Sequence, residues 1–195
     1  ARELFNQQKH NLSARNQLLT GAALDNAFNR NSLSQEKTDR LLDKYHLLPD
    51  TLLSGIYAIR QDNAIKLHQY REAVRADSIR LKDFGQTLSE TQKKDIQNNL
   101  KLWTALSDVP PQQVSVEGET LLKLEKDMAG LDNITVSAGG DTLGFIFDTG
   151  ANLSTICLSV AENMGMEIIP AEIQVGSITG EKVTAQLAVC RQMKI

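Results

Sequence analysis

The chain has 195 residues, of which 41% are apolar and 23% are charged, and its net charge is −3 at pH 7. This composition is typical of a folded protein, so it excludes an intrinsically disordered chain and a nucleic-acid binder that depends on net positive charge. No apolar run approaches the roughly 18 residues that a membrane-spanning helix needs, so no membrane span is expected.

The chain changes composition near its middle. Residues 1–109 contain 16 Lys and Arg against 13 Asp and Glu, with three Gly and two Val. Residues 110–195 contain five Lys and Arg against 11 Asp and Glu, with nine Gly and seven Val. Helix-forming composition therefore gives way to strand and turn composition. We predict a helical domain over 1–109, a linker over 110–119 that starts with two prolines, and a second domain over 120–195.

The first domain has the apolar spacing of amphipathic helices. Its clearest apolar stripe runs from Leu67 to Phe84, is interrupted only at Asp77, and is expected to end at Gly85. Ser32 to Gln35 and Ser89 to Gln92 are typical of helix N-caps, the second as a capping box. We expect a bundle of five or six helices, or stacked helix pairs that resemble tetratricopeptide repeats without a detectable repeat period. Besides the two capped helices, the pattern predicts helices over 12–30, 51–60 and 63–83.

The second domain shows short strands separated by turns. Gly139 and Gly140 give a hairpin signal, and one short helix is expected over 158–164 with Gly165 after it. The predicted fold class is therefore α+β, an all-α bundle followed by a mostly β domain. Strands are predicted over 120–125, 131–137, 143–147, 154–156, 173–177 and 182–189.

Asp148, Thr149, Gly150 and Ala151 follow one apolar strand and precede a second apolar run. A carboxylate at such a strand end is partly desolvated. Two such carboxylates at hydrogen-bond distance share one proton, so one can take a proton from water while the other donates to a peptide carbonyl. For this chemistry Thr149 offers a hydroxyl to the partner loop, Gly150 lets N–H groups approach, and Ala151 leaves room for substrate. The alternative is a turn whose Asp bonds only its own backbone.

This Asp-Thr-Gly-Ala segment, with its flanking apolar runs, resembles the active site of the retropepsin-like aspartic peptidases, here of bacterial type with an N-terminal helical domain. The segment from Val175 to Val183 resembles the flap of that family, a β-hairpin that closes over bound peptide. The resemblance implies an aspartic endopeptidase of retropepsin-like fold, without cofactor, that uses Asp148, Thr149 and Gly150 for catalysis. It further implies that substrate is contacted by Ala151, Gly176, Ser177, Ile178, Thr179 and Gly180.

The sequence contains one Asp-Thr-Gly, whereas the mechanism needs two carboxylates. The resemblance implies that the second comes from an identical subunit or from a second lobe. Because the chain ends at Ile195 as a strand begins, we expect a fragment with about the first half of the peptidase unit, inactive by itself. The alternatives are an inactive retropepsin-fold binding module and a helical adaptor. The start at Ala1, without Met, leaves open an exported or periplasmic protein whose targeting segment was removed.

Other candidate sites have weaker patterns. His10, His46 and His68 lack His or Cys partners at metal-binding spacing, so no metal site is expected. Cys157 and Cys190 could pair if their strands are neighbours, or remain free as small apolar side chains. No phosphate loop and no aromatic and basic patch for nucleic acid is present.

Overall fold

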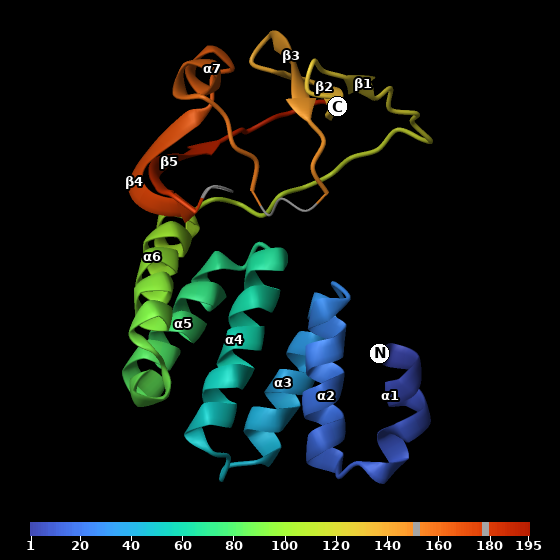
Figure 1. The fold of residues 1–195 in the computed structure, drawn as a ribbon, viewed down its shortest axis with the longest axis vertical. Helices are drawn as coiled ribbons and strands as arrows, with labels where there is room; N and C mark the ends of the chain where they lie inside the picture. Colours follow the sequence, from blue (N-terminus) through green and yellow to red (C-terminus); the bar gives the residue numbers. More distant parts are fainter. Residues whose placement is uncertain (150–152, 177–179) are drawn as a thin grey trace. The chain divides into compact units, whose positions relative to one another are not determined.

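The structure is a computed structural model that describes residues 1–149, 153–176 and 180–195. Its contacts divide the chain into two compact units, residues 1–113 and 114–195, which are described separately (Figure 1). No helix within the described ranges is both long enough and apolar enough to cross a membrane.

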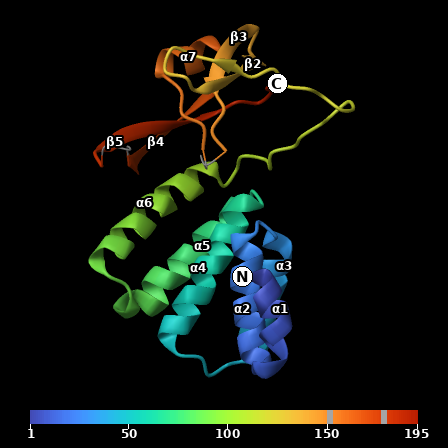
Figure 2. The same ribbon diagram turned by 45° about the vertical axis from the view of Figure 1, so that its right-hand side comes forward.

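Residues 1–113 form six α-helices, with short 3-10 turns at Lys9–Asn11 and Gly85–Thr87. From α2 onward each helix packs against the next one in the chain, and α2 also contacts α4 (Figures 1 and 2). This order is that of stacked antiparallel helices. The helices are α1 (Arg2–Gln8), α2 (Ala14–Ala27), α3 (Asn31–Lys44), α4 (Asp50–Lys66), α5 (Tyr70–Phe84) and α6 (Glu90–Leu106).

The N-cap predictions have opposite outcomes. At α6 the capping box is confirmed: Ser89 Oγ accepts from the Gln92 N–H at 3.2 Å, and Gln92 Oε1 accepts from the Ser89 N–H at 2.8 Å. At α3 the predicted cap is wrong, because the helix already begins at Asn31 and its N-cap residue, Arg30, makes no side-chain cap bond. Ser34 instead lies in the buried interior of this helix.

The predicted break between 60 and 63 is also wrong. Helix α4 continues to Lys66, and the chain turns at His68, whose φ is 56°. Packing of one continuous helix against both neighbours outweighs the local pattern there. Gly85 does follow the end of α5, but its φ of −56° is right-handed, so it continues into a 3-10 turn rather than a left-handed glycine cap.

Buried polar side chains join three of these helices. Ser34 Oγ donates to the Ala22 carbonyl at 2.8 Å, and Asn63 Nδ2 donates to Ser34 Oγ at 2.9 Å. Asn26 Nδ2 donates to Asn63 Oδ1 at 3.0 Å. Because a buried polar group is costly when it loses its partner, these bonds fix how α2, α3 and α4 align. The same unit contains an apolar cluster centred on Leu41, Leu48 and Ile56.

Asp77, which interrupts the predicted apolar stripe, is fully buried. Arg80 Nη1 donates to Asp77 Oδ1 at 3.2 Å, but Asp77 Oδ2 and Arg80 Nε have no hydrogen-bond partner in the described structure. Burial raises the pKa of Asp77 to about 6, and the opposing attraction of Arg80 is smaller. The ionised carboxylate therefore destabilises this unit at neutral pH.

Residues 114–195 contain two antiparallel sheets and one short helix in their described part. The first sheet has the order β1-β2-β3 and the second is the β4-β5 hairpin. The confirmed fold class is thus α+β, with a helical part followed by a β part. The elements are β1 (Glu125–Lys126), β2 (Asp132–Ala138), β3 (Asp141–Ile146), α7 (Leu158–Asn163), β4 (Glu167–Gly176) and β5 (Lys182–Val189).

Two predicted strands are not formed as expected. Residues 120–124 are exposed and carry no strand, and pairing begins only at Glu125–Lys126, opposite Asp132 and Asn133. Residues 154–156 also carry no strand. A β-prone sequence becomes a strand only where its backbone finds a partner, and neither segment has one among the residues that the structure describes.

The predicted β2–β3 hairpin turn is confirmed. Gly139 and Gly140 have φ values of 61° and 91°, the left-handed geometry of a two-residue turn. A Cβ at Gly139 would lie 2.3 Å from the Met164 carbonyl oxygen, so the turn packs directly on the end of α7. Met164 and Val136 are buried in the core of this unit.

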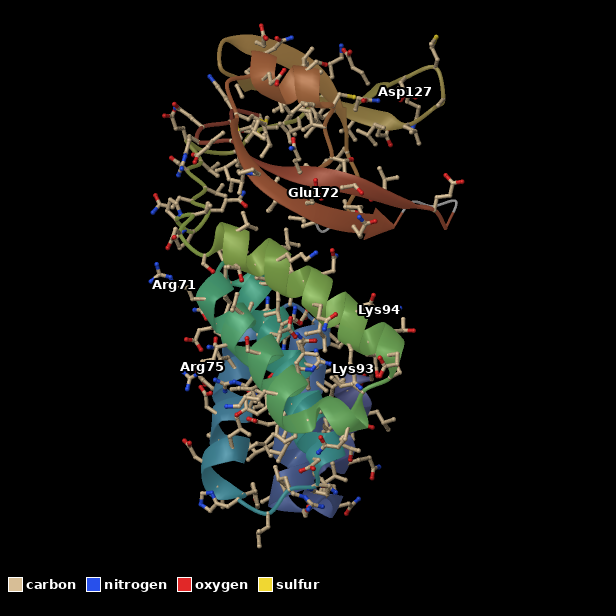
Figure 3. All side chains as sticks on the ribbon, turned by 90° about the vertical axis from the view of Figure 1, so that its left-hand side faces the viewer. Arg71, Arg75, Lys93, Lys94, Asp127 and Glu172 are labelled. Atoms are coloured by element: carbon tan, nitrogen blue, oxygen red, sulfur yellow. The ribbon has the colours of Figure 1, made fainter. Side chains whose placement is uncertain are left out.

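Asp127 stabilises the β1–β2 turn. Its Oδ1 accepts from the N–H groups of Leu131 and Ala129, each at 2.9 Å. These bonds to the ionised form lower the pKa of Asp127, and the Leu131 bond contributes most. The residue is labelled in Figure 3.

The first prediction concerns the pH dependence of folding. The folded chain holds the Asp77 proton up to a pH of about 6, whereas the unfolded chain releases it near 3.8. The free energy of unfolding should therefore fall as the pH rises between these values. The asparagine in the Asp77→Asn variant cannot titrate. The decrease in the free energy of unfolding between pH 4 and pH 7, measured by thermal melting, should therefore be smaller in this variant by roughly 2–3 kcal/mol.

Asp83→Asn is the matched control, because Asp83 is exposed on the same helix. Its pH dependence should equal that of the unmodified chain. If the free energy of unfolding changed equally with pH in the unmodified chain and in both variants, the destabilising role of the Asp77 charge would be contradicted.

The second prediction is that residues 1–113 fold alone. Their apolar cluster and the buried polar bonds of α2, α3 and α4 lie entirely within this unit. The expressed segment should show helical circular dichroism and a single cooperative melt. A helical but non-cooperative melt would show that the second unit is needed for packing.

Candidate active site

Asp148 lies two residues after the end of the β2–β3 hairpin. The strands pair Ile134 with Phe145, and the Phe147 N–H donates to the Asp132 carbonyl at 2.8 Å, one residue beyond β3. The ladder thereby fixes the backbone up to the residue before Asp148. The predicted order of an apolar strand followed by Asp148 and Thr149 is present.

Asp148 and Thr149 are exposed to solvent. The partial desolvation of Asp148 expected from the sequence is therefore wrong for a single chain. The reason is that its apolar neighbours do not shield it: Ile146 is 57% exposed and Phe147 is 48% exposed. Gly150 and Ala151, predicted for the same site, lie outside the described residues.

The predicted flap corresponds to the β4–β5 hairpin. Ile169 pairs with Leu187 and Ile173 with Ala185, so the residues between form a bulge around Pro170, which cannot donate a ladder bond. Glu172, in this bulge, is exposed (Figure 3). A bulge of this kind bends the hairpin.

The ends of the two strands carry the predicted flap glycines. Gly176 is the last residue of β4, which begins earlier than predicted, and Gly180 precedes β5 with a φ of 83°. That left-handed conformation suits glycine. Ser177, Ile178 and Thr179 lie outside the described residues.

One contact of the hairpin was missed by sequence reasoning. The Arg191 guanidinium, after β5, forms an ion pair with the Glu167 carboxylate at the start of β4. It joins the two ends of the hairpin that lie away from its turn. No local sequence signal predicts it, because the two residues become neighbours only through the strand register.

The two cysteines and His68 have the following surroundings. Cys157 and Cys190 are free thiols, so of the two alternatives the structure favours unpaired cysteines. His68 Nδ1 lies 3.3 Å from the Tyr70 hydroxyl, a packing contact. Among the described residues, no group of three or more His, Cys, Asp and Glu side chains could hold a metal ion.

Comparison with protein-family models gives one match. Residues 134–195 match a family described as aspartyl protease. The match begins in β2, contains Asp148 and the β4–β5 hairpin, and covers about a third of the chain. This region is similar to the aspartyl protease family. Comparison with curated proteins and with solved structures found no match.

This match to the aspartyl protease family model confirms the resemblance to retropepsin-like peptidases. It gives this region a protease-type, hydrolytic function in general, with peptides as the class of substrate. The roles assigned to individual residues of the site stay predictions.

The third prediction is that the chain associates through the apolar surface beside Asp148. Exposed apolar side chains grouped on one strand end favour burial against another surface. In sedimentation velocity, the mass should rise above the 21.5 kDa of one chain as concentration increases. Phe147→Ser should weaken this association by about tenfold, as for a residue central to an interface.

Leu47→Ser is the matched control, because Leu47 is 96% exposed but lies between α3 and α4. It should leave the association unchanged. Equal effects of both substitutions would contradict the location of the contact, and a concentration-independent mass of one chain would contradict the association itself.

Proposed function

We propose that the protein is an aspartic endopeptidase in which Asp148 is one of two catalytic aspartates. The two carboxylates share a proton and activate a water between them, which attacks the peptide carbonyl. Thr149 and Gly150 shape the loop that holds Asp148, and Ala151 with residues 176–180 contacts the peptide. The observation that carries this proposal is the position of Asp148, two residues after the end of β3 and inside the family-matched region.

The exposure of Asp148 supports a site completed by a second polypeptide surface. The proposed chemistry needs a second carboxylate at hydrogen-bond distance from Asp148 to share one proton. A second copy of the chain, or residues outside this sequence, would supply the second aspartate. The same contact would cover Ile146 and Phe147 and exclude water from the carboxylates.

The domain limits are part of the proposal. We assign residues 1–109 to a helical domain, 110–119 to the linker, and 120–195 to the peptidase region. Every residue from 110 to 124 is exposed and lies outside helices and strands. The two parts can then act as separately folded units.

The fourth prediction tests Asp148 as a catalyst. Cleavage of an unstructured polypeptide such as reduced casein should be lost on Asp148→Asn, by at least about a thousandfold, because the amide cannot exchange the proton. A statine-type transition-state mimic should block the unmodified protein. Specific activity should increase with chain concentration if a second copy supplies the other aspartate.

The control is Asp141→Asn, since Asp141 is also exposed and is also followed by Thr in the β2–β3 hairpin. It should retain activity. Excess Asp148→Asn chain mixed with the unmodified chain should inhibit it, because mixed pairs hold a single carboxylate. Cleavage that survives Asp148→Asn would refute the assignment, and turnover by a strictly single chain would refute the two-carboxylate site.

A further inference from the structure

A small pocket lies among α3, α4 and α5, within the helical unit. Its volume is about 170 Å³. Pockets for small-molecule ligands usually hold roughly 300–1,000 Å³, so this one has room for about one side chain. Leu42, Tyr57 and Ile79 give it an apolar wall.

Among the charged residues that line this pocket, two carboxylates are paired with arginines and one is not. Arg60 forms an ion pair with Asp39 across α3 and α4, and Arg75 Nη1 lies 3.9 Å from Glu72 Oε2 on α5. Asp43, which also lines the pocket, is exposed and has no hydrogen bond or ion pair with any residue that the structure describes. The site therefore carries an uncompensated negative charge.

An apolar wall with an aromatic ring and one unpaired carboxylate suits an aliphatic stem that ends in a cation. The methylene groups of a lysine or arginine can pack on Tyr57 and Ile79 while the charged head reaches Asp43. Glu72 and Arg75 at the rim, the latter projecting from α5 in Figure 3, offer an acceptor and donors to a peptide main chain. Polypeptides are also the substrate class of the family to which the other unit is similar.

We propose that this pocket binds a basic side chain of an extended polypeptide, with Asp43 holding the cation. The helical unit would then recruit polypeptides at a place separate from Asp148. This binding does not depend on the proposed peptidase activity, because it needs only residues of α3, α4 and α5.

The test is a nuclear magnetic resonance titration of the ¹⁵N-labelled 195-residue chain carrying Asp148→Asn, which prevents cleavage. The probes are capped heptapeptides of Gly, Ser and Ala with a central lysine, norleucine or glutamate. The lysine peptide should shift backbone signals of residues that line the pocket, at concentrations up to about 10 mM, the weak range expected for one side chain. The norleucine peptide, which has the stem without the charge, should bind several-fold more weakly.

Asp43→Asn should weaken lysine-peptide binding about twofold to fivefold, the effect of one exposed ion pair, and high salt should remove this difference. Glu36→Gln is the matched control: it removes an exposed carboxylate from α3 outside the pocket and should change nothing. The proposal would be overturned by equal binding of the lysine and norleucine peptides, by preference for glutamate, by the absence of shifts at the pocket residues, or by an unaffected Asp43→Asn variant.

Discussion

The turn at Gly139 and Gly140 is the constraint on which the protease-like region depends. Both residues adopt left-handed φ values, and a side chain at Gly139 would collide with the Met164 carbonyl. The turn therefore does two things at once: it sets the register of β2 and β3, and it brings the hairpin onto the end of α7. Asp148 lies two residues after the end of β3, so this register sets where the chain enters the Asp148 segment.

The two units use opposite means of stabilisation. The helical unit buries polar groups with partners, such as Ser34 and Asn63, and tolerates the ionised Asp77 at a cost in stability. The second unit buries few large apolar groups and leaves others, including Phe147, in water. We expect the first arrangement to be stable by itself and the second to favour a further surface. A peptidase site whose carboxylate becomes desolvated only on association would link assembly to activity.

Sequence patterns predicted elements well where a local signal decides them. The capping box at Ser89, the glycine turn before β3 and the exact extent of β5 are of this kind. Sequence patterns failed where tertiary packing decides whether a segment forms a helix or a strand. The helix predicted to stop near residue 60 runs on in α4, and residues 154–156 form no strand, since ladder bonds need a partner that sequence cannot supply.

By itself the sequence determined the α+β class, the change of character near the two prolines, and the Asp-Thr-Gly segment after an apolar strand, because composition and short-range order carry these properties. Only the tertiary structure decided that Asp148 is exposed, that Asp77 is buried, and that Asp43 shares a pocket with Tyr57. Solvent exposure and the meeting of side chains from different helices depend on which surfaces pack together. That property belongs to the whole fold and is not encoded at any single position.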